Sequence, residues 1–394
     1  MKTVKLRAGH VQPVWAGHPW VYAQAVESVD GALAGEAVTV VDPRGNALGT
    51  GFYSPQSAIA VRIFSRQAGA LFNAELVRSR VAAAIDLRAR LRLPSAETTG
   101  YRLVNAEGDG FPGLIVDRFG DALVVQLLSI GTKVNQEMIF DALEELTGAQ
   151  TIVDRTPPAM AKLERFEPGS GVVRGKATDA FEFRERGFDY RLPTELAQKT
   201  GFYFDQRALR GRVEELAGGL RVLDAYSFVG PFSLAAARGG ARSVSAVDNS
   251  SVAMTVGEAC AQANGFGDRI TFEKNDARVA LENAAKAGGF DLVIVDPPRL
   301  APTRTSRDKA LGAYSKVAQA GCAATANGGL LVYCSCSAAI DLGTLNRTLA
   351  SGALQANKHA TVIERHFQAG DHPVSAAFPE GLYLKAIIAR IDAR

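Results

Sequence analysis

The C-terminal half of the chain alternates between short apolar runs and segments with helical spacing. Beyond about residue 190 the apolar runs have the length of buried strands, and they read RVLDAY, SVSAVD, RITFEKND, DLVIVD and GLLVYCSC. Segments such as FSLAAARGG and SVAMTVGEACAQANG lie between them and are rich in helix-forming residues. This alternation predicts a mainly parallel sheet with helices on both faces. We therefore expect residues 191–394 to form one α/β domain.

The first 190 residues follow a different pattern, which changes at about residue 70. EAVTVVDPRGNALGTGFY and SAIAVRIF alternate like strands around a turn, so residues 1–70 are expected to form a small β-rich module. In residues 71–190, LFNAELVRSRVAAAIDLRARLRL and VNQEMIFDALEELTG have helical spacing, whereas GLIVDRFGDALVVQLLS and FEFRERGFDYRL favour hairpins. This middle stretch is expected to be a central α+β domain.

Composition narrows the class of protein. Hydrophobic residues make up 47% and charged residues 22% of the 394 residues, as in ordinary globular domains. The formal net charge of +3 permits an anionic partner without requiring one and excludes a polycationic protein. No apolar run is long enough for a membrane helix, and MKTVKLRAGHVQPV lacks the apolar core of a secretory signal. With only four cysteines, we expect a cytoplasmic protein with reduced thiols and no membrane partner.

Two aspartates and a glycine mark the ends of the first two strands of the α/β pattern. Asp224 ends the first strand, Gly230 lies in the following turn, and Asp248 ends the second strand. Ligands of doubly wound sheets bind where strands end, and an acid at this separation can hold a ribose diol. Because no phosphate-binding glycine loop is present, a nucleoside without phosphates fits better, and S-adenosylmethionine is one. The alternative is that each aspartate only caps a turn.

Asn275 and Asp276 follow the third strand, where their side chains could hydrogen-bond an adenine edge. Asn-Asp pairs are also ordinary turn residues, so their significance depends on their place in the series of strand ends.

Asp296 ends the fourth strand, directly before two prolines. Pro297 and Pro298 cannot continue the strand, so they create a rigid ledge with an acid at the cofactor end. Arg299 follows, where many N-methyltransferases have an aromatic residue that stacks on the target base. This difference argues against methylation of an exocyclic amino group.

A cysteine pair lies near the end of a later strand. Cys334 and Cys336 are expected on one face, with Ser335 opposite. The other cysteines and the histidines lack the spacing of zinc ligands, so no metal site is expected. A nucleophile fits better, because a thiolate that adds to C6 of cytosine makes C5 able to attack a methyl sulfonium. The alternative is that each cysteine is a small buried apolar residue.

Six stretches resemble the RlmI-like class I S-adenosylmethionine-dependent 23S rRNA cytosine-C5 methyltransferases: GHPWVY, EGDGFPGLIVDRFGD, KTGFYFDQR, VLDAYSFVGPFSLAAARGGARSVSAVDNS, DLVIVDPPR and VYCSCS. The resemblance extends over essentially the whole chain. It implies an N-terminal PUA-like domain, a central α+β domain and a C-terminal Rossmann-like methyltransferase domain. It also implies S-adenosylmethionine as cofactor and RNA, as 23S rRNA or the large ribosomal subunit, as partner.

The resemblance further implies roles for individual residues. Cys336 would be the nucleophile, with Cys334 as the second candidate, and Asp296 would contact N3 or N4 of the cytosine. The residues that would line the cofactor site are Asp224, Ser227, Gly230, Asp248, Asn249, Asn275, Asp276 and Asp296. KTGFYFDQR would form the floor beside it, through Lys199, Gly201, Phe202 and Asp205.

Cations of the PUA-like region are candidates for RNA contact, because RNA helices are recognised mainly through backbone and shape. The candidates are Lys2, Lys5, Arg7, Arg62 and Arg66, together with Arg299 of the C-terminal domain. Each could instead be a solvated surface charge. Two other functions stay open at this stage: methylation of guanine or uracil, and a non-catalytic role as an RNA-binding assembly factor. The oligomeric state also stays open, a homodimer included.

Overall fold

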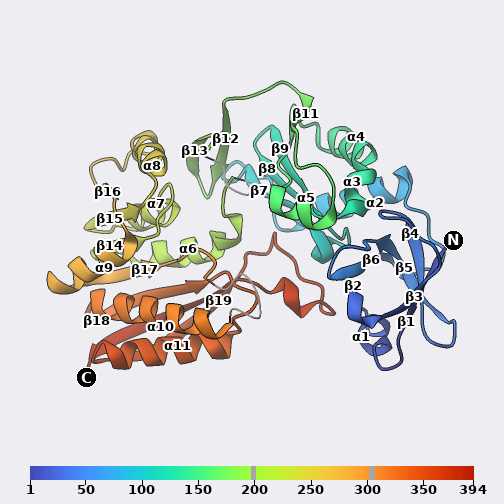
Figure 1. Cartoon of the computed structure of the whole chain (residues 1–394). Helices are drawn as coiled ribbons and strands as arrows, with labels where there is room; N and C mark the ends of the chain where they lie inside the picture. Colours follow the sequence, from blue (N-terminus) through green and yellow to red (C-terminus); the bar gives the residue numbers. More distant parts are fainter. Residues whose placement is uncertain (197–200, 301–306) are drawn as a thin grey trace. The chain divides into compact units, whose positions relative to one another are not determined.

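The computed structural model describes residues 1–196, 201–300 and 307–394, which form two compact units (Figure 1). Unit 1 comprises Met1–Gly187, Leu192–Phe204 and Gly370–Gly381, and unit 2 comprises Phe188–Arg191, Asp205–Ala369 and Leu382–Arg394. The late segment of unit 1 is held by the buried Arg88, which donates a 2.7 Å hydrogen bond to the carbonyl of Asp371. The predicted domain boundaries at residues 70 and 190 remain predictions. They assign Gly370–Gly381 to the C-terminal domain, whereas the contacts of this segment place it in unit 1.

The first sheet of unit 1 has six strands in the order β2-β6-β5-β4-β1-β3. Val4, Val38 and Val61 point into its core, since alternate residues of a half-buried strand face inward. The N-terminal module also contains the five-residue helix α1 (Val11–Trp15). The strands are β1 (Thr3–Leu6), β2 (Trp20–Tyr22), β3 (Val26–Val29), β4 (Ala37–Val41), β5 (Ala47–Tyr53) and β6 (Ile59–Ser65).

The second sheet of unit 1 has the order β11-β10-β9-β8-β7, and its β8–β9 hairpin confirms the one expected from GLIVDRFGDALVVQLLS. Its strands are β7 (Gly100–Asn105), β8 (Leu114–Phe119), β9 (Ala122–Leu127), β10 (Thr151–Asp154) and β11 (Gly171–Gly175). The helices are α2 (Ala74–Arg90), α3 (Ile130–Val134), α4 (Gln136–Thr147) and α5 (Pro158–Glu164). The strands β12 (Ala180–Glu185) and β13 (Phe188–Pro193) follow.

Unit 2 contains a seven-stranded sheet in the order β16-β15-β14-β17-β18-β20-β19. The first five strands are parallel, and β20 runs antiparallel to both of its neighbours. The α/β fold class and the five predicted strands are thereby confirmed. The strands are β14 (Arg221–Ala225), β15 (Ser243–Asp248), β16 (Ile270–Lys274), β17 (Phe290–Val295), β18 (Thr325–Ser335), β19 (Lys358–Phe367) and β20 (Lys385–Ala393).

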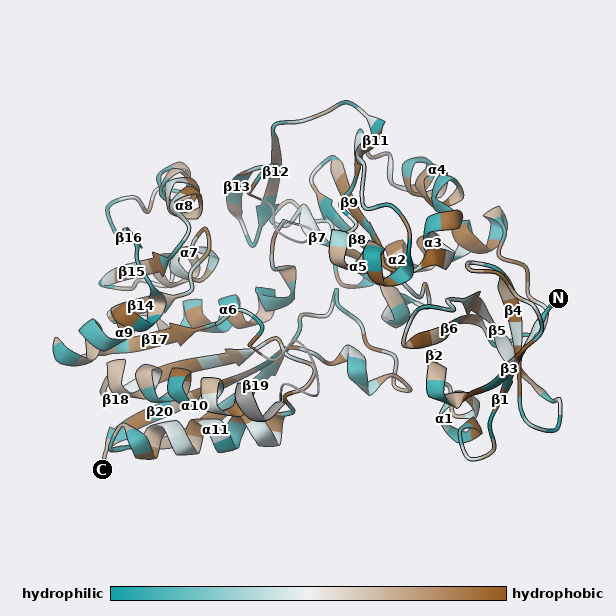
Figure 2. Cartoon of the chain, viewed as in Figure 1, coloured by the Kyte–Doolittle hydropathy of each residue, from teal (hydrophilic) through white to brown (hydrophobic). Residues whose placement is uncertain are grey.

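Helices cover both faces of this sheet. One face packs α9, α10 and α11 over a core that includes Leu223, Val293 and Tyr333, and α7 and α8 pack against β14 and β15 on the other. Strands covered on both sides must be apolar on both sides, and β17 is largely brown in Figure 2. The helices are α6 (Arg207–Leu216), α7 (Pro231–Arg238), α8 (Ser251–Ala263), α9 (Ala277–Lys286), α10 (Arg307–Ala324) and α11 (Leu342–Gln355). Among the described residues, no helix is both long and apolar enough to span a membrane.

Candidate active site

The strand order in the sheet of unit 2 reverses direction between β14 and β17. From β14 the chain proceeds outward to β15 and β16, then returns to the other side through β17 and β18. In a doubly wound sheet, the loops diverge at such a reversal and leave room for a ligand at the carboxyl ends of the strands. Asp224, Asp248, Asp296 and Cys336 all stand at those ends.

The loop after β14 is a strained turn fixed to the end of β15. Tyr226, Phe228 and Gly230 all have positive φ, at 67°, 54° and 76°. The amide of Ser227 donates to the carbonyl of Val247 at 2.9 Å, and the amide of Phe228 donates to Asp248 Oδ2 at 3.1 Å. These bonds hold residues in a sparsely populated conformation, as is typical of ligand-binding turns.

Gly230 ends this turn, and its place requires glycine for two reasons. Its φ is positive, and a Cβ there would stand 2.8 Å from the ring of Phe272. Pro231 follows as the first residue of α7, a position at which proline costs no helical hydrogen bond. The backbone is therefore free to approach a ligand at the start of α7.

The chemistry of the turn favours a cationic nucleoside over a phosphate. Burial raises the pKa of Asp224 to about 7, although the Ser233 hydroxyl donates to it at 2.7 Å, and the negative charge of Asp296 raises that pKa further. The buried Ser227 hydroxyl has no hydrogen-bond partner among the described residues. Two neighbouring acids repel a phosphate and are stabilised by a sulfonium or ammonium group. The donor set therefore fits S-adenosylmethionine.

The predicted cofactor residues beyond β14 lie in two environments. The Asp248 carboxylate accepts a hydrogen bond from the Phe228 amide in the turn. The main-chain carbonyl of Asp248 accepts a hydrogen bond from the amide of Asn275 at 3.0 Å, so β15 and β16 end together. Asn249 and Asp276 are exposed, and Asp276 caps α9 and pairs with Arg278 at 3.3 Å. The structure thus joins Asp224, Ser227, Gly230 and Asp248 around one turn, with Asn249, Asn275 and Asp276 at its outer edge.

The two late-strand thiols differ in their surroundings. Cys334 is fully buried within β18; burial and the charge of Asp296 raise its pKa well above the usual value. Cys336 follows the strand and is half-buried. Ser335 donates to the Tyr314 hydroxyl at 2.9 Å, on the α10 face, as the predicted alternation requires. No disulfide links the four cysteines, all of which lie within the described residues.

Asp296 has a neighbour that we do not single out in the sequence. Gln206, directly before α6, donates to Asp296 Oδ2 at 2.9 Å, and its own Oε1 is buried without a partner among the described residues. Gln206 also opposes the rise in the pKa of Cys334, so its amide lies close to both the acid and the buried thiol. Gln206 lies within KTGFYFDQR, the stretch from which other residues are selected as candidates for the floor of the cofactor site.

Lys385 is a second residue missed by sequence reasoning. It is buried at the start of β20, opposite Ser335, and donates to the carbonyls of Ser337 and Tyr383 at 2.7 and 2.8 Å. Burial lowers the pKa of Lys385 to about 8, against the opposing effect of a Cys336 thiolate. Arg299, exposed after the two prolines, lowers that pKa as well. A single lysine before the last apolar run is the only signal that the sequence offers.

The predicted floor residues are distributed over both units. Lys199 lies outside the described residues. Gly201 and Phe202 belong to unit 1, where Phe202 packs against Phe183 and Phe204 with ring centroids 5.1 Å apart. Asp205 belongs to unit 2 and accepts from the Tyr383 hydroxyl at 2.7 Å. Their role beside a cofactor stays a prediction.

The candidate RNA-contacting cations of the N-terminal module differ in their partners. Lys2 and Lys5 form exposed ion pairs with Glu36 and Glu27, at 2.9 and 3.5 Å. Arg62 is buried and pairs with the buried Glu164 at 2.9 Å, so its charge is not presented to a ligand and we no longer include it. The remaining two, Arg7 and Arg66, hydrogen-bond main-chain carbonyls.

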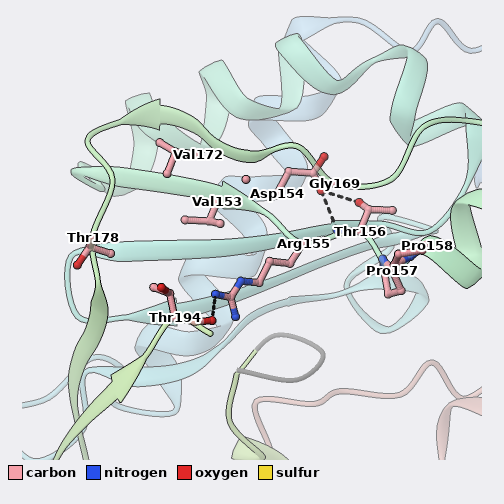
Figure 3. Close-up of a pocket in the computed structure, with 11 residues that line it drawn as sticks. Val153, Asp154, Arg155, Thr156, Pro157, Pro158, Gly169, Val172, Thr178 and Thr194 are labelled. Atoms are coloured by element: carbon pink, nitrogen blue, oxygen red, sulfur yellow. Dashed lines mark hydrogen bonds between the residues drawn. The ribbon is translucent and has the colours of Figure 1, made fainter. Parts of the chain in front are cut away.

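Unit 1 contains a pocket of about 580 Å³, lined in part by Arg155, Thr156, Val172 and Thr194 (Figure 3). The Arg155 guanidinium donates to the carbonyl of Thr194 and lies 5.1 Å from the ring centroid of Phe181. None of the predicted catalytic or cofactor residues lines this pocket. Among the described residues, no group of three or more His, Cys, Asp or Glu side chains could hold a metal ion.

Comparison with known proteins places this chain in a class. Residues 101–371 match the family described as S-adenosylmethionine-dependent methyltransferase, and residues 4–66 match the PUA-like domain family. The fold and this family match together define a class I S-adenosylmethionine-dependent methyltransferase. The chain belongs, more particularly, to the ribosomal RNA large subunit methyltransferase I family. Its relatives of that name in Alteromonas mediterranea and Photobacterium profundum are both 34% identical.

These similarities extend over nearly the whole chain. The Alteromonas relative aligns with 95% of this chain and 95% of its own length, and the Photobacterium relative with 97% and 98%. A Streptococcus mutans protein assigned as a SAM-dependent methyltransferase has the same fold, with a TM-score of 0.84, 20% identity, and 99% and 100% of the two chains covered. A second structure, of a protein assigned as a methyltransferase and crystallised with SAH, has a TM-score of 0.86 and 21% identity, and the match again covers 99% of this chain and 100% of the other. The chain is therefore an enzyme, which sets aside the non-catalytic assembly factor.

Proposed function

We propose that this enzyme forms 5-methylcytosine in 23S rRNA through a covalent bond between Cys336 and C6 of the target cytosine. The rRNA substrate is suggested by the relatives named for the large ribosomal subunit. The observation that carries the base and the mechanism is the position of Cys336. It is a half-buried thiol at the carboxyl end of β18, beside a buried lysine and on the edge of the sheet that holds Asp224 and Asp296.

Cys336 is favoured over Cys334 because a nucleophile must be reachable and must ionise. Cys334 is sealed within the sheet, where burial and the charge of Asp296 keep its thiol protonated. The Lys385 ammonium, bonded to the carbonyl of the residue next to Cys336, favours the Cys336 thiolate. The thiolate is the form of cysteine that adds to a ring carbon.

Asp296 is the group that would orient the cytosine. The Gln206 amide donates to one of its carboxylate oxygens and thereby fixes its direction, while Pro297 prevents the strand from continuing past it. A carboxyl group can contact both N3 and the N4 amino group of cytosine. Proton sharing at N3 stabilises the charge that develops in the ring when the thiolate adds to C6.

The cofactor would be held by the turn after β14 and the end of β15. Ser227 offers an unpartnered buried hydroxyl, Asp248 offers a carboxylate for the ribose diol, and Gly230 allows close approach of the backbone. When bound, S-adenosylmethionine supplies an electrophilic methyl group. Asp224 and Asp296 contribute negative charge that stabilises a cationic donor at this edge.

The reaction then follows from the roles of these residues. The cytosine leaves its stack, which costs a few kcal/mol unless it is already unpaired. The Cys336 thiolate bonds to C6, and the displaced electron pair makes C5 nucleophilic, so that C5 gains the methyl group. A base removes the C5 proton, and the breaking of the sulfur–C6 bond returns the thiolate and the aromatic ring.

Product analysis tests the proposed base. Ribosomal RNA from cells that lack this protein, incubated with the purified enzyme and S-adenosylmethionine, should acquire 5-methylcytidine at one position, detected by nucleoside mass spectrometry. The same RNA from cells that contain the protein should accept little methyl group. Methylated guanosine or uridine in place of 5-methylcytidine would show that another base is the target.

Replacement of Lys385 should change the pH dependence of the enzyme. Because burial lowers its pKa to about 8, the ammonium charge is present below pH 8 and is lost as the pH rises through 8. Lys385→Met should therefore lower kcat/KM about tenfold at pH 7, equivalent to a change of about one pKa unit at Cys336. It should also remove a descending limb near pH 8 from the pH profile of kcat/KM.

Lys385→Arg is the matched control, because arginine stays charged above pH 8. This variant should keep its activity at alkaline pH better than the parent does. A descending limb near pH 8 that persists in Lys385→Met would assign that titration to another group.

A further inference from the structure

The N-terminal module exposes a tryptophan that its packing does not explain. Trp15 is the last residue of α1, and 75% of its surface is exposed. The other tryptophan, Trp20, is half-buried and donates a 2.8 Å hydrogen bond to Glu107. Burial of a large aromatic side chain is favourable, and an exposed one forgoes that stabilisation in the free protein. Trp15 is therefore a candidate contact for a ligand.

Two arginines accompany α1, one in space and one in the chain. Arg66 donates to the carbonyls of Val14 and Gly17, so its guanidinium lies at the carboxyl end of α1, with Trp15 between those two residues in the chain. Arg7 precedes α1 and donates to the carbonyl of Val26 at 3.0 Å.

Neither arginine is neutralised by an acid. Among the described residues, their guanidinium groups hydrogen-bond carbonyls and form no ion pair, in contrast to Lys2, Lys5 and Arg62. Arg66 therefore presents a positive charge without an acidic partner at the carboxyl end of α1, where Trp15 stands. The two carbonyl bonds of Arg66 use only part of its five N–H donors, so further donors remain for an anion.

An exposed aromatic ring with an arginine beside it has the chemistry of a single-stranded nucleic-acid contact. A base stacks on the ring, and arginines contact the phosphates on either side. A protein partner fits less well, because the exposed neighbours of Trp15 in the chain are Gln12, Pro13 and Ala16 rather than a broad apolar patch.

We propose that Trp15 stacks on an unpaired base of the RNA substrate while Arg66 holds an adjacent phosphate. This inference rests on the proposed function only in taking RNA as the substrate. It assigns the N-terminal module to a single-stranded segment of the RNA and not to a duplex.

RNA binding by Trp15 variants tests the proposal. The probes are a mixed-sequence, 12-nucleotide single-stranded RNA and a blunt duplex of the same sequence, each titrated into the full chain without S-adenosylmethionine. Trp15→Ala should bind the single strand about tenfold more weakly, as expected for the loss of one stacked base, and the duplex with unchanged affinity. Trp15→Phe should stay within about threefold of the parent. Leu33→Ala, which removes another apolar side chain of the module that is 67% exposed, should change neither affinity.

Tryptophan fluorescence adds a measurement that would not change if Trp15 had only a structural role. The chain has only two tryptophans. Stacking should quench Trp15 in the parent when the single strand is added, whereas Trp15→Phe, which retains Trp20 alone, should bind without that quenching. Unchanged S-adenosylmethionine affinity in each variant controls for folding.

The outcomes separate this inference from the proposed function. Single-strand affinity of Trp15→Ala equal to that of the parent, or an equal loss for single strand and duplex, would overturn the stacking role. A parent chain that binds neither RNA would overturn the proposed substrate itself. Because no methyl transfer occurs in the assay, the result holds whichever base is methylated.

Discussion

Cys336→Ser should abolish methyl transfer, with a loss of at least about 10⁴-fold in kcat, while S-adenosylmethionine affinity stays within about threefold of the parent. A serine hydroxyl at this position has no strong base to remove its proton and is a far weaker nucleophile than a thiolate. The cofactor turn after β14 and the end of β15 do not depend on the thiol for their hydrogen bonds. Single-turnover methylation of RNA and calorimetric binding of the cofactor measure the two effects separately.

The matched control is the neighbouring thiol. Cys334→Ala should keep kcat within about fivefold, because the buried Cys334 is not reached by the substrate, and it should instead lower stability through a small cavity. With S-adenosylmethionine present, a 5-fluorocytidine-containing RNA should form a covalent complex with Cys334→Ala and none with Cys336→Ser, because fluorine at C5 cannot be removed as the proton is. The reverse pattern would assign the nucleophile to Cys334.

Asp296→Asn should reduce kcat by about 10² to 10³-fold, the range expected when a group that shares a proton with the reacting ring is lost. Asparagine preserves the shape of the side chain and can still accept from Gln206, so the hydrogen bond of 2.9 Å has a counterpart in the variant. Affinity for RNA should fall far less than kcat, because the lost interaction strengthens only as C6 is attacked. Single-turnover rates at saturating RNA give the chemical step directly.

The same substitution offers an electrostatic readout within the protein. The charge of Asp296 raises the pKa of Asp224, so Asp296→Asn should shift the titration of Asp224 below its value of about 7 in the parent. NMR titration of the Asp224 carboxyl can follow this change. Full activity in Asp296→Asn would exclude the carboxyl group from the reaction, whatever the change at Asp224.

The alternation of strands and helices determined where the chemistry of unit 2 would lie. Because the carboxyl ends of parallel strands meet at one edge, Asp224, Asp248, Asp296 and Cys336 could be assigned to that edge from their positions in the chain alone. The β8–β9 hairpin was predictable for a similar reason, since a tight turn between two apolar runs is a local signal. Local patterns thus sufficed wherever the relevant partner is a neighbour in sequence or in the regular order of the sheet.

Only the tertiary structure decided which side chains meet across long separations. Arg62 resembles any surface cation in sequence, yet it is buried against Glu164, 102 residues further along the chain. Gln206 reaches Asp296, and Lys385 reaches the residue after Cys336, through sheet and loop packing that no local pattern encodes. The sequence by itself therefore determined the layout of the strand ends, because that layout follows from local periodicity. The charge around Cys336 and the difference between the two thiols were decided by the folded chain, because burial and long-range contacts exist only there.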